Sequence, residues 1–336
     1  MKRAGVAALL LAGLAACGGG SGGGATGPTP TQEPAYPLDG TLRLNQIQVL
    51  GTHNSYHVAP PPGPGVTPDR DITQSTLTIQ LDHQSVRQVE LDVHAGRPGG
   101  LAVFHLDGDE GTTCPTFVQC LTEVRAWSQR NRGHLPVFVL VEPKDDPGAP
   151  VDAAAVDAEV RRVFTPAELL TPDDVQGDAP TLSQAVLERG WPALGATRDK
   201  VVVVLNAPVP TRAAYTSGET SLHGRAMFVY SDPASPLAAF MSVPDARLEG
   251  ARIVGLVRSG YMVRTRADDS GVEARADDLS RATAALASGA QLVSTDFPAP
   301  APSGYVVAMP GTPARCNPVT VAPGTPCSPK DVESLP

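Results

Sequence analysis

Residues 137–141 read Val-Phe-Val-Leu-Val and residues 201–205 read Val-Val-Val-Val-Leu, two apolar runs that no polar residue interrupts. A strand that is covered on both faces has this continuous apolar pattern, and such strands occur in parallel sheets that lie between helices. We therefore predict that both segments are central strands of a parallel sheet.

Further short apolar runs bring the number of predicted strands to eight. Amphipathic stretches at 72–87, 117–131, 151–164 and 277–288 supply crossover helices between them. Alternating strands and helices predict a parallel sheet, and eight strands in roughly 260 residues favour one α/β domain, a (β/α)8 TIM-like barrel, over two smaller domains. The predicted strands are 47–52, 88–93, 101–106, 137–141, 201–205, 226–230, 261–265 and 291–295.

The first residues have the pattern of a secretory signal, with Met-Lys-Arg at 1–3 and an apolar run up to residue 16. This run is shorter than the roughly 20 residues that cross a bilayer. Leu-Ala-Ala before Cys17 resembles the lipobox of bacterial lipoproteins, which implies a lipidated Cys17; an ordinary signal peptide is the alternative. We expect a membrane-anchored protein of the bacterial cell envelope, exposed outside the cytoplasm. The expected parts are a signal peptide (1–16), a lipidated cysteine with a Gly/Ser/Pro linker (17–40), the barrel (41–298) and a Pro/Gly-rich tail (299–336).

Four more cysteines lie beyond the linker, and three pairings of them are possible. The short separations and an oxidising compartment favour two local disulfides, Cys114 with Cys120 and Cys316 with Cys327. A metal site is the alternative, although neither pair has the C-x-x-C spacing typical of zinc.

The chain has 35 acidic and 26 basic residues and a formal net charge of −9. It therefore lacks the basic character that nucleic-acid binding requires. Contact with a membrane would depend on the lipid anchor and on local surface.

Polar side chains follow several predicted strands at their carboxyl ends, where TIM barrels place their active sites. Glu90 and Asp92 are two residues apart on one strand, so both point into the barrel. Two buried carboxylates require a cation, and oxygen ligands favour calcium or magnesium. Asn54 and Glu142 follow neighbouring strands and are further candidate ligands. An acidic pair that meets solvent or an arginine is the alternative.

Two histidines, His53 and His105, end the first and third predicted strands. A phosphodiester bound to the metal would lie between them, so that one acts as base and the other as acid, as imidazole can near neutral pH. Lys144, Arg264 and Arg266 are candidate contacts for phosphate or inositol hydroxyls. Ion pairs with nearby carboxylates are the alternative for each of these three.

The motifs GTHNSY at 51–56, VELDV at 89–93, FH at 104–105 and VEPK at 141–144 resemble the X-region of phosphoinositide-specific phospholipases C. The similarity is greatest to the bacterial calcium-dependent branch. The segments RTRAD at 264–268 and STDF at 294–297 also resemble its late strands, so the resemblance covers nearly the whole barrel.

The resemblance implies a calcium ion and a phosphatidylinositol-type substrate that the protein meets at a membrane, and nothing in the sequence implies a protein partner. By the same resemblance, His53 stabilises the pentacoordinate phosphorane and His105 protonates the leaving diacylglycerol oxygen. The implied ligands of Ca²⁺ are Asn54, Glu90, Asp92 and Glu142. The calcium ion would activate the inositol 2-hydroxyl, which attacks phosphorus to give a cyclic phosphate.

Two features depart from the wider family. Eukaryotic members carry lysines around the fifth strand, whereas this strand ends in Leu205-Asn206, which favours plain phosphatidylinositol over polyphosphorylated lipids. A glycerophosphodiester phosphodiesterase is the nearest alternative, but its first motif is His-Arg-Gly, while Asn54 follows His53 here. A lipoprotein that binds lipid or inositol phosphate without turnover is an alternative of another class.

Overall fold

The computed structural model describes residues 36–96, 100–144, 146, 148–309 and 313–334. The predicted signal segment, Cys17 and most of the predicted linker lie outside the described residues. Residues 34–336 form one compact unit. Among the described residues, no helix has both the length and the apolar character that crossing a membrane requires.

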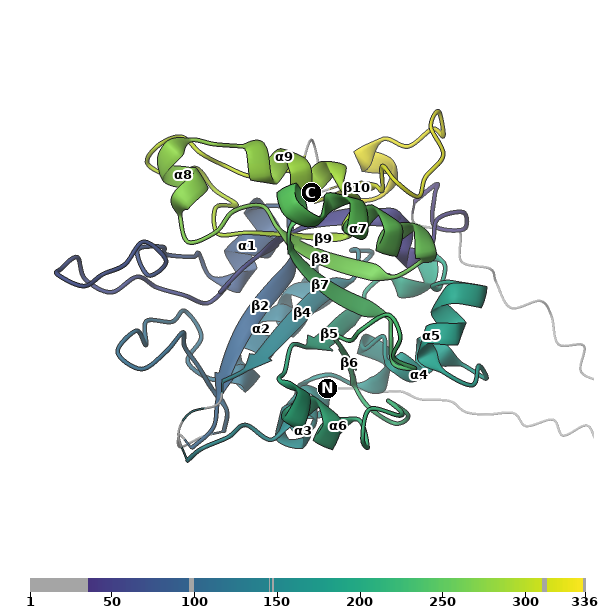
Figure 1. Cartoon of the computed structure of the whole chain (residues 1–336), viewed down its shortest axis with the longest axis horizontal. Coiled ribbons are helices and arrows are strands. Elements are labelled where there is room, and N and C mark those ends of the chain that lie inside the picture. The colour runs from purple at the N-terminus through teal and green to yellow at the C-terminus, as the bar shows by residue number, and fades with distance from the viewer. Residues whose placement is uncertain (1–35, 97–99, 145, 147, 310–312, 335–336) are drawn as a thin grey trace, which may run out of the picture. The chain divides into compact units, whose positions relative to one another are not determined.

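Eight parallel strands form the barrel (Figure 1), so the predicted (β/α)8 architecture is confirmed. Their hydrogen-bonded order is β6-β5-β4-β2-β1-β9-β8-β7. A parallel bridge between Tyr230 and Phe240 joins the two outermost strands of this order. The strands are β1 Ile47–Thr52, β2 Val86–His94, β4 Val137–Pro143, β5 Val201–Leu205, β6 Met227–Val229, β7 Phe240–Asp245, β8 Met262–Arg266 and β9 Leu292–Thr295.

The predicted strand 101–106 is wrong as a barrel strand. Only β3, Ala102–Val103, is extended there, and it pairs antiparallel with the end of β2 through His94 and Ala102. The few residues between β2 and β3 are too short for a helical crossover, so the chain can only fold back as a hairpin. The position of His105 therefore comes from a loop that extends β2, not from a third barrel strand.

Strand β7 is the barrel strand that the sequence pattern missed. It contains Ser242 and Pro244, and its register with β8 shifts between Ser242 and Asp245. Proline within an apolar run usually argues against a strand because it cannot donate to the ladder. The irregular register accommodates Pro244, and β7 completes the eight strands of the barrel.

Helices cover the outside of the strands, and the four predicted crossover helices are present with shorter bounds. In α2, Thr116 caps the first turn by accepting a hydrogen bond from Gln119 N–H, and Phe117, Leu121 and Val124 form the buried face. The helices are α1 Leu77–His83, α2 Phe117–Arg130, α3 Ala153–Val163, α4 Pro172–Gln176, α5 Leu182–Gln184, α6 Val209–Tyr215, α7 Ala246–Ser259, α8 Val272–Ala276 and α9 Ser280–Ala287; short 3-10 or π turns lie at Leu44–Gln46, Pro166–Glu168, Ala185–Arg189, Leu194–Thr197 and Pro329–Asp331.

The last part of the C-terminal tail packs against the amino ends of the barrel strands. Strand β10, Ala314–Cys316, pairs antiparallel with the start of β1, and the structure joins Cys316 to Cys327. Near the end of the tail, the buried Glu333 carboxylate lies 2.5 Å from Arg87 at the start of β2. This part of the tail is thus attached to the end of the barrel opposite the carboxyl ends of the strands, whereas Tyr305, earlier in the tail, contacts Asp268 just after β8.

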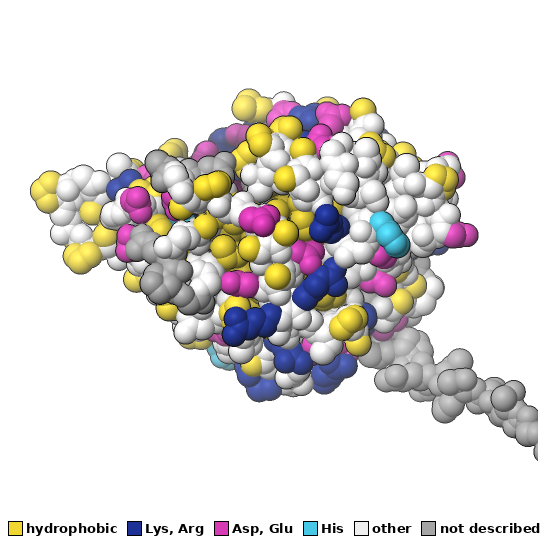
Figure 2. Space-filling model, turned by 90° about the horizontal axis from the view of Figure 1, so that it is seen from below, with side chains coloured by type: hydrophobic (Ala, Val, Ile, Leu, Met, Phe, Trp, Pro, Cys, Tyr) yellow, Lys and Arg dark blue, Asp and Glu magenta, His cyan; other side chains and the backbone are white. Residues whose placement is uncertain are grey.

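The surface carries charges of both signs. Figure 2 shows basic side chains gathered over one part of the face that it presents, while acidic and neutral side chains occupy much of the rest. The negative net charge is therefore not spread evenly over this face.

Candidate active site

An acidic cluster lies at the carboxyl ends of β2 and β4, where the sequence predicts a metal site. Parallel pairing places Asp92 beside Glu142, and Glu90 lies one strand repeat earlier on the same face of β2. Carboxylate oxygens of these three residues lie within 4.8 Å of one another. The structure thus brings three of the four predicted ligands into one group.

The cluster has the properties of a site for a hard cation. The pKa of Asp92 is raised to about 7, chiefly by burial and also by the charges of Glu142 and Glu90, although Lys144 opposes the shift. Asp92 keeps its Oδ1 atom buried without a hydrogen-bond partner among the described residues. Three oxygen donors and an unsatisfied buried carboxylate fit calcium, which takes oxygen ligands and balances their charge.

Lys144 provides the positive charge next to Asp92 and Glu142 in this structure. Its Nζ atom lies 2.9 Å from Asp92 Oδ2 and also donates to Glu142. Burial would lower the pKa of Lys144, but the two carboxylates raise it above its ordinary value. The predicted alternative for this lysine, an ion pair with the acidic residues, is thus what the structure contains. Asn206, at the end of β5, donates to the other Glu142 oxygen over 2.8 Å.

Glu90 is paired with an arginine from the far side of the barrel. Arg264 on β8 donates to Glu90 over 2.6 Å and to Ser294 on β9 over 2.9 Å. Burial would raise the pKa of Glu90, but Arg264 and then His53 lower it below its ordinary value. Arg264, a predicted phosphate contact, is therefore occupied by ion pairing within the protein.

Asn54, the fourth predicted ligand, is buried in the turn after β1. Its φ of 45° lies in the left-handed region, which asparagine tolerates better than most residues. The next residue fixes this turn to β2, because Ser55 N–H donates to the Glu90 carbonyl and Ser55 Oγ accepts from Glu90 N–H. The turn thus holds Asn54 next to the strand that carries the acidic cluster.

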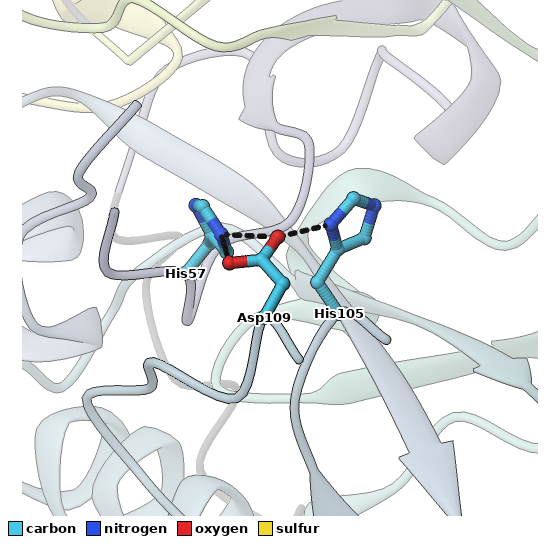
Figure 3. Close-up of side chains that lie close together, drawn as sticks. All are labelled: His57, His105 and Asp109. Atoms are coloured by element: carbon cyan, nitrogen blue, oxygen red, sulfur yellow. Dashed lines mark hydrogen bonds and ion pairs between the residues drawn. The ribbon is translucent and has the colours of Figure 1, made fainter. Parts of the chain in front are cut away.

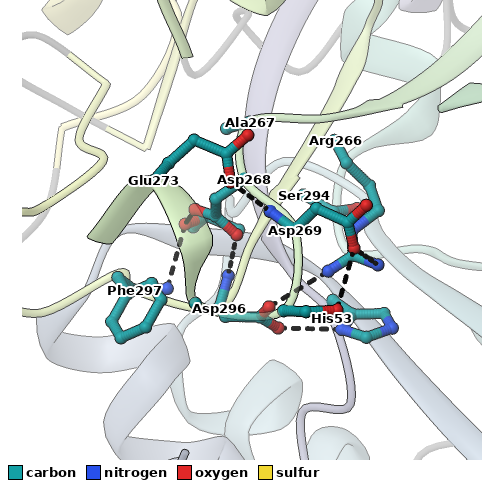
Figure 4. A network of polar contacts seen from close by, with 12 residues as sticks. His53, Arg266, Ala267, Asp268, Asp269, Glu273, Ser294, Asp296 and Phe297 are labelled. Carbon is teal, nitrogen blue, oxygen red and sulfur yellow. Dashed lines mark hydrogen bonds and ion pairs between the residues drawn. The ribbon is translucent and has the colours of Figure 1, made fainter. Parts of the chain in front are cut away.

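His53 is held by a carboxylate from β9 (Figure 4). It donates from Nδ1 to Asp296 over 2.8 Å, and its Nε2 atom lies 4.0 Å from Glu90. Burial would lower the pKa of His53, but Asp296 and Glu90 raise it above the ordinary value despite the charge of Arg266. Because the side chain is 23% exposed, Nε2 is the ring nitrogen available to a substrate.

A second layer of polar contacts orients Asp296. Arg266 donates to Asp296 over 3.0 Å and lies 3.4 Å from Asp269. The wholly buried Asp268 accepts from the backbone N–H of Asp296 and from the Thr295 hydroxyl. Burial, reinforced by Asp296, raises the pKa of Asp268 to about 7. Of these two neighbouring carboxylates, Asp269 forms an ion pair with Arg266, while Asp268 holds the backbone that carries Asp296.

His105 has a carboxylate partner that the sequence analysis missed. It donates from Nδ1 to Asp109 over 2.7 Å, and Asp109 also lies 3.1 Å from Nε2 of the buried His57 (Figure 3). Burial lowers the pKa of His105 even though Asp109 opposes the shift, and Lys144 contributes to the lowering. The separation of four residues between His105 and Asp109 is the only local signal for this pair. His57, which the sequence analysis did not select, also belongs to this group.

Three further histidines lie outside these groups. His94 donates to Asp146 and contacts the Phe104 carbonyl, so it supports the loop that carries His105. His134 and His223 contact groups elsewhere in the structure.

A barrel mouth with an acidic cluster between two carboxylate-held histidines defines a class of protein, the metal-dependent phosphodiesterases. The family description that matches this chain is "Phosphoinositide phospholipase C, Ca2+-dependent", over residues 42–103 and 97–318. This match covers most of the chain, which therefore belongs to the family of calcium-dependent phosphoinositide phospholipases C.

Solved structures of bacterial enzymes share the fold. A calcium-dependent phosphoinositol-specific phospholipase C from Pseudomonas sp. has 19% identity and a TM-score of 0.59, over 85% of this chain and 99% of that one. A Ca²⁺-dependent phosphatidylinositol-specific phospholipase C from Streptomyces antibioticus has 18% identity and a TM-score of 0.57, over 76% of this chain and 95% of that one. A comparison with curated proteins finds no match.

Proposed function

We propose that this protein cleaves phosphatidylinositol-type lipids in a calcium-dependent reaction, giving diacylglycerol and an inositol cyclic phosphate. The observation that carries the proposal is the placement of two histidines, each fixed by its own carboxylate, around an acidic cluster at one barrel mouth. Family membership supports the phosphodiesterase chemistry and the calcium requirement.

Glu90, Asp92 and Glu142, with Asn54, would hold the calcium ion. Bound there, calcium supplies Lewis-acid activation of the attacking hydroxyl and binds a phosphate oxygen. Lys144 already balances the charge of Asp92 and Glu142. Its flexible side chain can turn toward the substrate phosphate when a divalent ion takes over that balance.

His53 would serve the attacking side of the reaction. Asp296 fixes the proton on Nδ1, so that Nε2 takes the proton of the inositol 2-hydroxyl as the new O–P bond forms. The raised pKa of His53 favours this proton transfer and stabilises the resulting imidazolium beside the charged phosphorane. Arg266 holds Asp296 and is the arginine that we propose as a contact for substrate oxygens.

His105 would serve the leaving side. Asp109 engages Nδ1, which leaves Nε2 to donate a proton to the diacylglycerol oxygen as its bond to phosphorus breaks. Burial, which lowers the pKa of His105, makes the imidazolium a stronger acid. Active sites divide acid and base roles by giving two titratable groups environments that shift their pKa values in opposite directions.

Plain phosphatidylinositol is the head group that we propose. Asn206 stands at the end of β5, where it donates to Glu142 instead of offering a positive charge to a ring phosphate. We further propose that a lipid on Cys17 anchors the protein to a membrane of the bacterial envelope, with the 17–40 linker as a tether.

The proposal is tested by assaying the purified protein on phosphatidylinositol vesicles with calcium or with a chelator. Diacylglycerol and water-soluble inositol phosphates are measured, with His53→Ala as the control. Calcium-dependent release that is lost in the variant supports the proposal. Cleavage of glycerophosphocholine instead of the lipid would identify a glycerophosphodiesterase, and binding without release would identify a non-catalytic lipoprotein; either result would refute the proposal.

A further inference from the structure

His57 makes two polar contacts from a buried position behind His105. Its Nδ1 atom lies 2.6 Å from the Ile72 carbonyl, and its Nε2 atom lies 3.1 Å from both oxygens of Asp109. The exposed fractions of the His57 and Asp109 side chains are 3% and 0%. The ring is therefore fixed at both nitrogens and does not reach the open mouth itself.

The segments that carry these two side chains are joined through the backbone. Val58 N–H donates to the Gly111 carbonyl, and Thr113 N–H donates to the Tyr56 carbonyl. A Cβ atom at residue 111 would lie 2.0 Å from the Val58 carbonyl oxygen, so only glycine allows this approach. The turn after β1 and the loop after β3 are thus held together by backbone contacts.

Both ring nitrogens of His57 face hydrogen-bond acceptors, the Ile72 carbonyl and the Asp109 carboxylate. His57 therefore offers a polar partner to the buried Asp109 carboxylate, whose other neighbours among the described residues are His105 and the more distant Arg70, at 4.0 Å. A buried carboxylate is costly without such compensation.

We propose that His57 is a positioning residue that acts through Asp109 to aim His105 at the leaving oxygen. The Ile72 carbonyl holds His57, His57 holds the Asp109 carboxylate, and Asp109 holds Nδ1 of His105, so that Nε2 of His105 points to the substrate. This inference rests on the proposed role of His105 as the acid. The charge of His57 also contributes to the lowered pKa of His105, after the larger effect of burial.

His94 is a second buried histidine near His105, and it provides a comparison because it shares no carboxylate with His105. It also engages both ring nitrogens, with Asp146 and the Phe104 carbonyl, and it stacks on the Phe104 ring. The Asp146 side chain is 29% exposed and contacts no second histidine in the described part of the chain. Of His57 and His94, it is His57 that is connected to His105 through a shared carboxylate.

The test compares two substrates that differ in the leaving group. Phosphatidylinositol releases an alkoxide that needs a proton, whereas an inositol phosphate ester of p-nitrophenol releases a phenolate that leaves without one. A defect in proton donation therefore slows the first substrate alone. The ratio of the two activities does not depend on the fraction of protein that is folded, because only folded enzyme contributes to either.

We expect His57→Gln to lower kcat for phosphatidylinositol by about tenfold, a part of the roughly 10²- to 10⁴-fold that a positioned acid contributes. We expect KM, and the activity on the nitrophenyl ester, to change by less than about twofold, since neither needs the acid. His134→Gln is the matched control, because His134 is also buried and bonded at both nitrogens but lies before the amino end of β4. This control should leave the ratio of the two activities unchanged.

The same assay separates failure of the inference from failure of the proposed function. The inference is overturned if His105→Ala shows the selective loss while His57→Gln shows no loss or an equal loss on both substrates. In that case the role of His105 stands. If His105→Ala itself shows no selective loss, the proposed acid role fails. In the double variant, His57→Gln should cause no further loss once His105 is removed.

Discussion

His53 and His105 each donate from Nδ1 to a carboxylate, over 2.8 Å to Asp296 and over 2.7 Å to Asp109. The pKa of His53 is nevertheless raised, whereas the pKa of His105 is lowered. Burial lowers both pKa values. At His53, Asp296 and then Glu90 outweigh burial and the positive charge of Arg266, whereas at His105 Asp109 does not outweigh burial and the positive charges of His57 and Lys144. The same local pair therefore supports opposite roles because the balance of burial and surrounding charge differs.

Among substitutions of the carboxylates, those in the acidic cluster should cause the largest loss of activity. Asp92→Asn removes the buried carboxylate, and we expect kcat/KM for phosphatidylinositol to fall by about 10²- to 10³-fold, since a metal supplies several kcal/mol to such transition states. Calcium should raise the midpoint of thermal unfolding of the wild-type protein and not that of the variant. If the variant keeps its kcat/KM and its calcium-dependent rise in the unfolding midpoint, Asp92 is not a ligand of the metal.

Asp296→Asn tests the attacking side. The substitution removes the charge that raises the pKa of His53, so this pKa should fall below its ordinary value, because burial then acts with less opposition. Titration of the ring by NMR in metal-free protein measures the shift. Activity should fall by about 10²-fold on both the lipid and the nitrophenyl ester, since both need the same attack. Selective loss on the lipid would contradict the assignment.

Asp109→Asn tests the leaving side with a matched change. Asp109 raises the pKa of His105, so removing its charge should lower that pKa further, and the same NMR titration measures it. Activity on phosphatidylinositol should fall by about tenfold, because the acid loses its alignment. Activity on the nitrophenyl ester should stay within about twofold of wild type, and an equal loss on both substrates would show a general structural defect.

Glu333→Ala should have the smallest effect on chemistry and a large one on stability. It leaves the buried Arg87 without its carboxylate, and we expect the free energy of unfolding to fall by about 3–5 kcal/mol. Turnover by the folded protein should change by less than about twofold, because the pair lies at the amino ends of the strands. Glu249→Ala, which breaks an exposed pair with Arg252, is the control and should cost less than about 1 kcal/mol. Loss of turnover at full stability would show coupling between the two ends of the barrel.

The sequence predicts those parts of the molecule that follow from strand geometry. Alternation along a strand places Glu90 and Asp92 on one face, and the rule that active sites lie at carboxyl ends brings Glu142 beside them. The observed register pairs Asp92 with Glu142. Such residues are predictable because each strand limits its side chains to two directions.

The remaining features depend on contacts that have no local pattern. Pro244 interrupts the apolar pattern of β7, so the pattern does not predict this strand. The hairpin at β3 has the same apolar pattern as a barrel strand. Asp109 lies in a loop whose position is fixed by backbone contacts with the turn after β1. Glu333 meets Arg87 across 246 positions of the chain. Contacts of this kind arise only when the chain closes, so the sequence pattern alone does not reveal them.

The most direct test of the divided roles is the activity of His53→Ala and His105→Ala on both substrates at saturating calcium. We predict that His53→Ala loses about 10²- to 10⁴-fold on both, and that His105→Ala loses a similar factor on phosphatidylinositol but less than about threefold on the nitrophenyl ester. Equal losses of the two variants on both substrates would contradict the assignment of His53 to the attacking side and His105 to the leaving side.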